Sequence, residues 1–174
     1  MKYETAVAVG RGAVAEVFKA WDPEARRHVA LKMFPPGSDA CSERYRREAR
    51  AQGRLRHPSI CEIYEEGVTG EGRPYIAMRF VDGEPLDRAA LRLPIPDRVR
   101  LVRQVADAVG CAHRADLIHR DLKPGNLLVE DGADGGLRAF VLDFGIVHMN
   151  EGTPLTETGQ ILGTPGYLSP EQAR

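Results

Sequence analysis

The spacing of the apolar residues changes along this chain of 174 residues, and each spacing fits only one kind of secondary structure. Alternating apolar and β-branched residues predict five strands, at residues 3–10, 15–22, 27–34, 61–67 and 74–80. Between the third and the fourth strand the spacing becomes helical, from Cys41 to Leu55, and His57 and Pro58 end the predicted helix. The first half of the chain is therefore predicted to form a five-stranded sheet with one helix.

The second half of the sequence combines one long helix with a short hairpin. Apolar residues recur at helical spacing over residues 97–114, and Asp97 is predicted to cap the N-terminus of this helix. Short strands are predicted at 126–130 and 137–142, on either side of a turn rich in Gly and Asp. Residues 79–85, RFVDGEP, are predicted to connect the two halves. The chain is therefore predicted to have an α+β fold made of two parts.

Composition and charge argue against several classes of protein. Hydrophobic residues make up 43% of the sequence, as in ordinary globular proteins, and the formal net charge is -1, which gives no electrostatic basis for binding nucleic acid or an acidic membrane surface. No apolar run approaches the ~20 residues of a membrane helix, and the N-terminus lacks the apolar core of a signal peptide, so we expect a cytoplasmic protein without a membrane segment. Cys41, Cys61 and Cys111 are widely spaced and show no metal-binding pattern, so we expect reduced thiols.

Residues 117–128, LIHRDLKPGNLL, carry the most specific motif in the sequence. A solvated Pro-Gly turn would account for only part of this stretch. Asp121 and Asn126 complete the pattern H-R-D-L-x-x-x-N, so the stretch resembles the catalytic loop of the protein kinases. Phosphotransferases that act on aminoglycosides or choline have a similar loop, but they tend to have His-Gly-Asp where this chain has His119, Arg120 and Asp121. The motif therefore favours a protein kinase over a small-molecule phosphotransferase.

The resemblance implies phosphoryl transfer from ATP with the help of Mg²⁺. In that reaction a carboxylate orients the substrate hydroxyl and accepts its proton, and a neutral oxygen donor next to it binds the metal ion. Asp121 and Asn126 correspond to these two groups. Lys123 is typical of kinases specific for Ser and Thr, in which it contacts the transferring phosphate. We therefore expect ATP and Mg²⁺ as the ligands of the chain.

Two further motifs supply charged groups for the phosphates. Asp143 begins the sequence D-F-G and is the second expected Mg²⁺ ligand. Lys32 ends the sequence VALK, which resembles V-A-I-K, and is expected to pair with the α- and β-phosphates while Glu48 holds its ammonium group. One departure is Gln52, which stands where family members commonly have an apolar residue that stacks on the Phe of D-F-G. The catalytic residues implied by the resemblance are Asp121, Lys123, Lys32 and Glu48.

The nucleotide itself is expected to lie between the two halves of the chain. Residues 10–17, GRGAVAEV, resemble the Gly-rich loop that covers the phosphates, with Ala15 in place of the third glycine. Met78 is expected to line the back of the adenine pocket, and the backbone of Arg79 and Val81 to bind the base. The nucleotide-binding residues implied by the resemblance are Gly10, Arg11, Gly12, Val17, Ala30, Lys32, Met78, Arg79 and Val81.

The last part of the sequence resembles a kinase activation segment. Residues 169–171, SPE, stand at the A-P-E motif. Thr153, Thr156 and Thr158 are candidate phosphorylation sites, and Arg120 is the expected receptor for the added phosphate through charge-assisted hydrogen bonds. The resemblance therefore implies control by phosphorylation without choosing among the three threonines.

These motifs follow one another in the family order along nearly the whole chain. We therefore interpret the sequence as a bacterial-type Ser/Thr protein kinase with a two-lobe fold. Residues 1–80 would form the N-terminal lobe, a five-stranded antiparallel sheet with one helix, and residues 81–174 the first part of a mainly helical C-terminal lobe. The implied partners are ATP and proteins with Ser or Thr hydroxyls, and a dimer is expected for trans-autophosphorylation.

Two expectations concern activity. Kinase domains of this family usually continue well beyond the residue that corresponds to Glu171, so the sequence predicts a C-terminally truncated domain with weak or no activity as a separate chain. A non-catalytic nucleotide-binding pseudokinase or scaffold is the alternative, which Gln52 favours. The joint presence of five catalytic-type residues argues against it: Lys32, Glu48, Asp121, Asn126 and Asp143.

Overall fold

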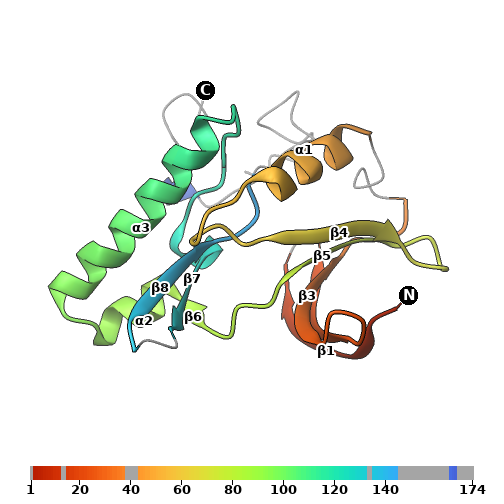
Figure 1. Ribbon diagram of the computed structural model, residues 1–174, viewed down its shortest axis with the longest axis horizontal. Coiled ribbons are helices and arrows are strands. Elements are labelled where there is room, and N and C mark those ends of the chain that lie inside the picture. Colours follow the sequence, from red (N-terminus) through yellow and green to blue (C-terminus); the bar gives the residue numbers. More distant parts are fainter. Residues whose placement is uncertain (1, 13–14, 38–42, 133–134, 145–164, 168–174) are drawn as a thin grey trace.

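The computed structural model contains two sheets with their helices, joined by one extended segment (Figure 1). It describes residues 2–12, 15–37, 43–132, 135–144 and 165–167. The first half of the chain builds the larger sheet with one helix, and the second half builds the smaller sheet with the remaining helices. The α+β class predicted from the sequence is confirmed.

The larger sheet contains the five strands that the alternating apolar residues predict. They are β1 (Glu4–Arg11), β2 (Glu16–Asp22), β3 (Arg27–Met33), β4 (Ile63–Val68) and β5 (Pro74–Arg79). The strands lie in the order β1-β2-β3-β5-β4, and every neighbouring pair is antiparallel. The central strand β3 is buried on both faces, with Val29 and Leu31 on one side and Ala30 and Lys32 on the other.

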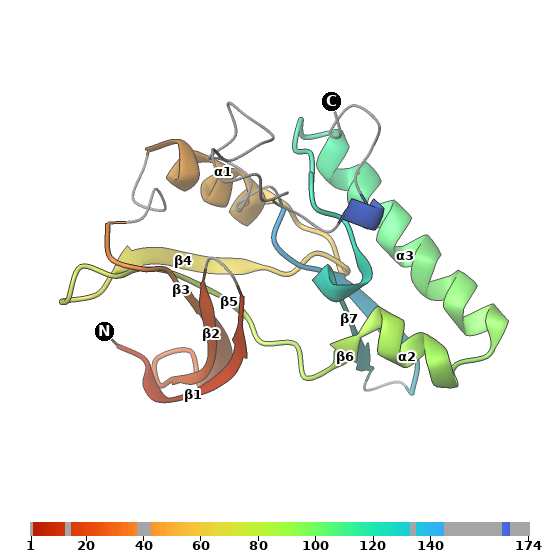
Figure 2. The same ribbon diagram turned by 180° about the vertical axis from the view of Figure 1, so that it is seen from behind.

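Helix α1 (Glu43–Arg54) packs beside β4, as Figure 1 and Figure 2 show from opposite sides. The sequence predicts this helix over residues 41–55. Ala49 and Gln52 on its predicted inner face are buried, whereas the side chain of Glu48 lies outside the described part of the chain. The helix therefore covers the sheet with the face that its apolar spacing indicates.

The smaller sheet and two helices form the second half. Its strands are β6 (Glu84–Pro85), β7 (Leu127–Asp131) and β8 (Leu137–Val141), in the antiparallel order β6-β7-β8. The helices are α2 (Leu86–Arg92) and α3 (Ile95–His113), and short 3-10 turns occur at Pro124–Asn126 and Pro165–Tyr167. Helix α3 packs on β8 through one buried stripe: Leu101, Val105, Ala108 and Ala112.

Three local features of this half differ from the sequence prediction. Helix α3 begins at Ile95 with Pro94 as its N-cap, so the prediction that Asp97 caps it is wrong; Asp97 lies in the first turn and pairs with Arg100. Proline suits a helix start, because its missing N–H would have no intrahelical partner there. Strand β6 and helix α2 are not predicted from the sequence, because two and seven residues are too few to show a periodic pattern.

Main-chain hydrogen bonds join the two sheets through the segment between α1 and β4. Val141 N–H donates to Ser59 O (2.8 Å), and Cys61 N–H donates to Val141 O (3.0 Å). These bonds place Ile60 beside Val141 in a parallel bridge. The end of β8 is therefore fixed to the first half of the chain, next to the cleft described below.

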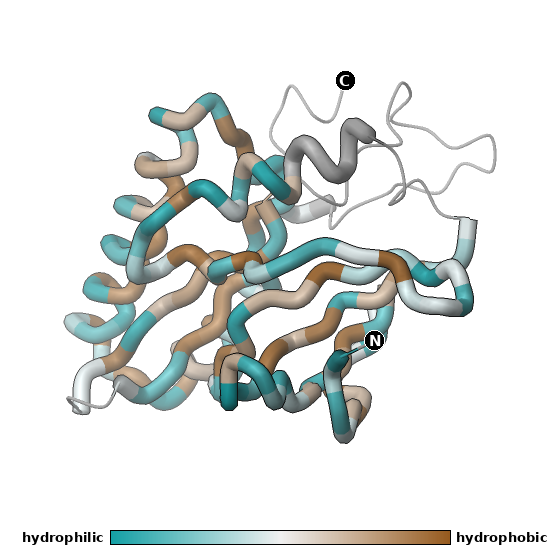
Figure 3. The backbone as a smooth tube through the Cα atoms, turned by 45° about the vertical axis from the view of Figure 1, so that its right-hand side comes forward, coloured by the Kyte–Doolittle hydropathy of each residue, from teal (hydrophilic) through white to brown (hydrophobic). Residues whose placement is uncertain are grey.

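The buried apolar residues form three clusters. One lies between α2, α3 and the smaller sheet, and a second lies between α1 and the larger sheet and includes Phe140 of β8. The third covers the other face of the larger sheet, around Val29 and Leu31. Figure 3 shows hydrophobic residues recurring along the strands and alternating with hydrophilic ones along the helices. Among the described residues, no helix has the length and apolar character that crossing a membrane requires.

Candidate active site

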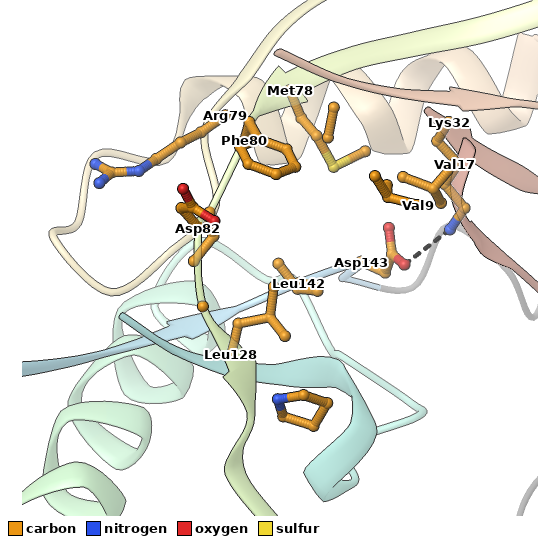
Figure 4. A pocket seen from close by; sticks show the side chains of 14 residues that line it. Val9, Val17, Lys32, Met78, Arg79, Phe80, Asp82, Leu128, Leu142 and Asp143 are labelled. Atoms are coloured by element: carbon orange, nitrogen blue, oxygen red, sulfur yellow. Dashed lines mark ion pairs between the residues drawn. The ribbon is translucent and has the colours of Figure 1, made fainter. Parts of the chain in front are cut away.

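A cleft of about 320 Å³ lies between the two sheets, and Figure 4 shows the side chains around it. Its walls are formed by apolar side chains from both sheets: Val9, Val17, Ala30, Met78, Leu128 and Leu142. Lys32 and Asp143 stand at one end, and residues 79–83 run along the other. An apolar slot with charged groups at one end suits a flat base that is joined to phosphates.

The structure brings together most of the predicted nucleotide-binding residues. Those that line the cleft are Val17, Ala30, Lys32, Met78, Arg79 and Val81. Gly10, Arg11 and Gly12 do not line it and lie where β1 ends and turns toward β2. There Gly10 pairs with Val17, and Gly12 N–H donates to Ala15 O (2.9 Å). The three residues are therefore placed beside the cleft rather than in its wall.

Five apolar residues of the cleft are absent from the predicted nucleotide-binding set: Val9, Phe80, Pro85, Leu128 and Leu142. Two of them could have been found from the motifs. Leu142 directly precedes Asp143, and Leu128 follows Asn126 by two positions. Val9 precedes the Gly-rich motif. The alternation of side chains along β1 does not indicate which face of the strand is turned toward a ligand, so Val9 could not be assigned to the cleft.

Lys32 and Asp143 form an ion pair at the end of the cleft. Lys32 Nζ lies 2.8 Å from Asp143 Oδ2, and the Lys32 side chain is only 8% exposed (Figure 4). Asp143 Oδ1 is buried and has no hydrogen-bond partner among the described residues. The sequence predicts Glu48 as the partner of Lys32, and that pairing stays a prediction because the Glu48 side chain is not described.

The predicted catalytic loop is held together by contacts to Asp121. Lys123 Nζ lies 2.8 Å from Asp121 Oδ2. Asn126 Nδ2 donates both to Asp121 Oδ2 (2.9 Å) and to Asp121 O (2.7 Å). The 3-10 turn at Pro124–Asn126 brings these groups together, and Asn126 N–H closes it by donating to Lys123 O (2.9 Å). Since the Asn126 amide nitrogen faces Asp121, its amide oxygen is the atom left for a cation.

Leu142 connects this loop to Asp143 through its backbone. Leu142 N–H donates to Asn126 O (2.9 Å), and His119 Nε2 lies 2.7 Å from Leu142 O. Asp121 N–H donates to His119 Nδ1 (3.3 Å), so the ring proton must be on Nε2, which donates to Leu142 O. Burial lowers the pKa of His119, in keeping with this neutral tautomer, although the bond to Leu142 and the nearby carboxylates oppose the shift.

Two residues of the site adopt left-handed backbone conformations. Arg120 has φ of 64°, and Asp143 has φ of 51°. For residues with a Cβ atom this conformation costs roughly 1–2 kcal/mol. Such costs are tolerated where neighbouring contacts over-determine the backbone, as the bonds to His119 and Leu142 do here. The strain therefore falls on Asp143 itself and on Arg120, the residue that precedes Asp121.

Behind the loop, the rings of His119 and Phe144 make a tilted contact with their centres 4.9 Å apart, and Phe144 is fully buried. Gln52 is also buried, as its place in the sequence predicts. Its Nε2 donates to Cys61 O at a long 3.3 Å, and its Oε1 has no partner among the described residues. The core behind the site therefore contains one polar side chain with only part of its hydrogen bonds formed.

Asn126 and Asp143 fit a Mg²⁺ ion by the chemistry of their oxygens. A hard cation prefers carboxylate and amide oxygens, and the unpartnered Asp143 Oδ1 is such an atom. The described residues contain no group of three or more His, Cys, Asp or Glu that could hold a metal by itself, so water and phosphate oxygens would complete the shell.

Several predicted residues of the activation segment cannot be placed in this site. Thr153, Thr156, Thr158 and residues 169–171 lie outside the described residues. Their predicted roles therefore stay predictions. Cys61 and Cys111 are free thiols, as expected, and Cys41 lies outside the described part.

Comparison with known proteins agrees with this geometry. Residues 3–174 match the protein kinase domain family. The chain is 37% identical to the serine/threonine-protein kinase pkn3 of Myxococcus xanthus, over 99% of this chain and 34% of that protein. It is 35% identical to the serine/threonine-protein kinase PknA of Mycobacterium tuberculosis, over 99% of this chain and 41% of that protein.

A solved structure shows the same architecture. The crystal structure of Rad53 1-466 in complex with AMP-PNP matches 99% of this chain and 43% of that chain, with a TM-score of 0.77 and 26% identity. The chain therefore belongs to the protein kinase domain family. It spans well under half the length of the two bacterial relatives that it matches.

Proposed function

We propose that this site transfers a phosphoryl group from ATP to Ser or Thr hydroxyls of proteins. The observation that carries the proposal is the loop in which Lys123 and Asn126 both contact the Asp121 carboxylate. The same loop is bonded to Leu142, so Asp121 has a fixed relation to Lys32 and Asp143 in the cleft. The names of the bacterial relatives support Ser/Thr specificity, as Lys123 does.

The adenine base would lie in the apolar part of the cleft. Met78, Leu128 and Leu142 would contact its faces and edge, and the backbone of Arg79 and Val81 would bind its polar atoms. Val81 is buried and makes no hydrogen bond to any residue that the structure describes, so its N–H is available to an acceptor on the base. Arg79 O, which already accepts from the Cys61 thiol (3.4 Å), has a second lone pair for a donor.

The phosphates would lie at the charged end of the cleft. Lys32 would donate to phosphate oxygens in place of its present contact with Asp143. Asn126 and Asp143 would hold Mg²⁺, which neutralises the negative charge that gathers on the phosphates during transfer. In this arrangement Lys32 and Lys123 would face phosphate groups. Asp143 would face the Mg²⁺ ion, and Asp121 would accept a proton.

Asp121 would act on the substrate hydroxyl. Its carboxylate accepts the hydroxyl proton while the substrate oxygen bonds to the γ-phosphorus and the bond from that phosphorus to the bridging oxygen of ADP breaks. Lys123, 2.8 Å from the carboxylate, would place its positive charge beside the transferring group. Because ATP is the donor, the proposal assigns the reaction to the cytoplasm, with Thr153, Thr156 and Thr158 as candidate sites of trans-autophosphorylation in a dimer.

The proposal is tested by comparing Asp121→Asn with the unaltered protein, both in the 174-residue chain and in a C-terminally extended protein. We expect Asp121→Asn to abolish transfer to a generic basic protein, measured by mass spectrometry, while Mg-ATP affinity changes by less than about threefold. Transfer that persists in Asp121→Asn would refute the role of this carboxylate.

A second candidate is a non-catalytic nucleotide-binding scaffold. The buried oxygen of Gln52, which has no hydrogen-bond partner among the described residues, favours it, because an unsatisfied polar group weakens the packing of the core. Binding of Mg-ATP by the extended protein without any transfer to protein substrates or to itself would support this candidate. Transfer that depends on Asp121 would exclude it.

A further inference from the structure

One carboxylate of the second sheet makes two contacts with the segment that connects the two halves. Glu130 Oε2 accepts from Arg79 Nη2 (2.8 Å), and Glu130 Oε1 accepts from Asp82 N–H (3.1 Å). The Glu130 side chain is 18% exposed. Its bond with Arg79 is partly buried, whereas its bond with Asp82 N–H is exposed to water. None of the sequence motifs assigns a role to Glu130.

The two contacts fall on either side of Phe80 and Val81. Arg79 precedes these two residues and Asp82 follows them, so a single carboxylate holds both ends of the stretch. Phe80 and Val81 both line the cleft, and Val81 carries the free N–H proposed to bind the base. The distance between this N–H and the rest of the cleft is therefore set in part by Glu130.

The Arg79 side chain is better fixed than an ordinary surface arginine. Its guanidinium group lies 4.4 Å from the ring centre of Phe140, and Phe140 is 1% exposed. An arginine held at once by a carboxylate and by the face of a buried ring loses little further freedom when it pairs. Isolated ion pairs on an exposed surface contribute little to stability. This pair differs from them because it is partly buried and because Glu130 makes a second contact.

Strand β7 supplies the surface on which the connecting segment lies. Glu84 and Pro85 pair with Val129 and Leu128, and a Cβ atom at Gly83 would lie 2.2 Å from Val129 O, so the backbones are in direct contact. Leu128 and Glu130 are two positions apart and share one face of β7. One face of this strand therefore supplies both the floor of the cleft and the contacts to the connecting segment.

From this arrangement we propose that Glu130 is a positioning residue for nucleotide binding. It holds Arg79 and Asp82 so that Phe80 and Val81 keep the shape that accepts the base. The proposal rests on the proposed function, since it requires a nucleotide in the cleft. It assigns to Glu130 no contact with the nucleotide itself, and it predicts a loss of affinity that depends on the base and not on the phosphates.

The test measures binding of adenosine and of Mg-ATP by titration calorimetry, using the full chain and four variants. Glu130→Ala removes both contacts, Glu130→Gln keeps an acceptor for Asp82 N–H, and Arg79→Met keeps Glu130 with that N–H. We expect about tenfold weaker binding for Glu130→Ala and about threefold for the other two, equally for both ligands. Asp97→Asn, which removes an arginine contact of 3.0 Å on α3, is the control and should stay within about twofold of the unaltered chain.

A double substitution separates positioning from general destabilisation. Because Arg79 acts through Glu130, adding Arg79→Met to Glu130→Ala should weaken binding by less than about twofold further. Thermal unfolding of every variant shows whether it is folded. If Glu130→Ala is not folded, the affinity of Glu130→Gln, which keeps the size and shape of the side chain, tests the positioning role. Rescue of affinity by Glu130→Gln relative to Glu130→Ala supports the proposal.

The outcomes are distinguishable from a failure of the proposed function. If the unaltered chain binds neither adenosine nor Mg-ATP, the proposed function is wrong and the inference falls with it. If the unaltered chain binds both ligands and the folded Glu130 variants bind them equally well, the inference alone is wrong. A loss confined to Mg-ATP would also overturn it, because Glu130 would then act on the phosphate end.

Discussion

Two glutamines of this chain differ in how completely they are hydrogen-bonded, and the difference predicts opposite effects of the same substitution. Gln104 on α3 is satisfied at both ends: Nε2 donates to Leu137 O (3.0 Å), and Oε1 accepts from Ala139 N–H (2.8 Å). Gln52 makes one long bond of 3.3 Å to Cys61 O, and its buried Oε1 has no partner among the described residues. Methionine has nearly the length of glutamine and no groups that must be hydrogen-bonded.

The magnitudes follow from the bonds. Replacing Gln52 by Met removes an unsatisfied buried oxygen, a gain of about 2 kcal/mol. It also loses one weak bond and takes that donor from Cys61 O, a cost of about 1 kcal/mol because the bond is long. Gln52→Met should therefore raise the free energy of unfolding by about 1 kcal/mol, which corresponds to roughly 2–4 °C in Tm for a chain of this size. Gln104→Met loses two good bonds and leaves two backbone groups unpaired, so it should lower the free energy of unfolding by about 2 kcal/mol.

Urea unfolding of the two variants beside the unaltered chain measures both changes in the free energy of unfolding. The expected difference between the variants is about 3 kcal/mol. Because both variants bury the same methionine side chain, the free energy of transferring its thioether from water largely cancels in this difference. The sign for Gln52→Met is the decisive result. If Gln52→Met destabilises the chain as much as Gln104→Met does, Oε1 of Gln52 has a strong partner and the account of an incomplete polar group behind the site is refuted.

Three further predictions concern single groups. The buried, neutral His119 has a pKa below its ordinary value of about 6.5, so near pH 6.5 the unfolded chain binds more protons than the folded chain. The free energy of unfolding should therefore fall as the pH is lowered below about 6.5. Urea midpoints measure this dependence, which should be smaller in His119→Asn. Burial, with a smaller contribution from the Asp143 charge, raises the pKa of the Cys61 thiol to about 12. In a Cys41→Ser background, Cys61 should therefore react with a disulfide reagent at pH 8 on the order of a hundredfold slower than the half-buried Cys111. Gly83→Ala should lower the free energy of unfolding by about 1–3 kcal/mol, because its Cβ would lie 2.2 Å from a backbone oxygen of β7; an unchanged urea midpoint would contradict this.

The features that the sequence predicts well depend on short stretches of chain. Alternation along β3 places Val29 and Lys32 on opposite faces whatever lies around the strand, so the strands could be located without knowing their neighbours. The contact between Asp121 and Asn126 is also local, because one 3-10 turn at Pro124–Asn126 closes the gap between them. In this loop the spacing of the motif therefore predicts which side chains are in contact.

The features that the sequence does not predict depend on pairing between distant segments. The contact of Lys32 with Asp143 and that of Arg79 with Glu130 each join the two sheets, and no local pattern indicates them. The sequence predicts a role only for the backbone of Arg79, because its side chain matches no motif. Helix α2 and strand β6 were missed for a different reason, since both are shorter than any periodicity can show.

The arrangement of charge and backbone at the site has a consequence for every substitution in it. Asp121 and Asp143 would repel each other, and each is paired with its own lysine, Lys123 and Lys32, which are two of the four lysines in the sequence. The positions of the two aspartates are nevertheless set by main-chain groups, since Leu142 donates to the catalytic loop through its N–H and accepts from it through its C=O. Changing one carboxylate to an amide alters the charge and leaves these backbone bonds in place. The loss of transfer expected for Asp121→Asn can therefore be attributed to the missing base and not to a displaced metal-binding aspartate.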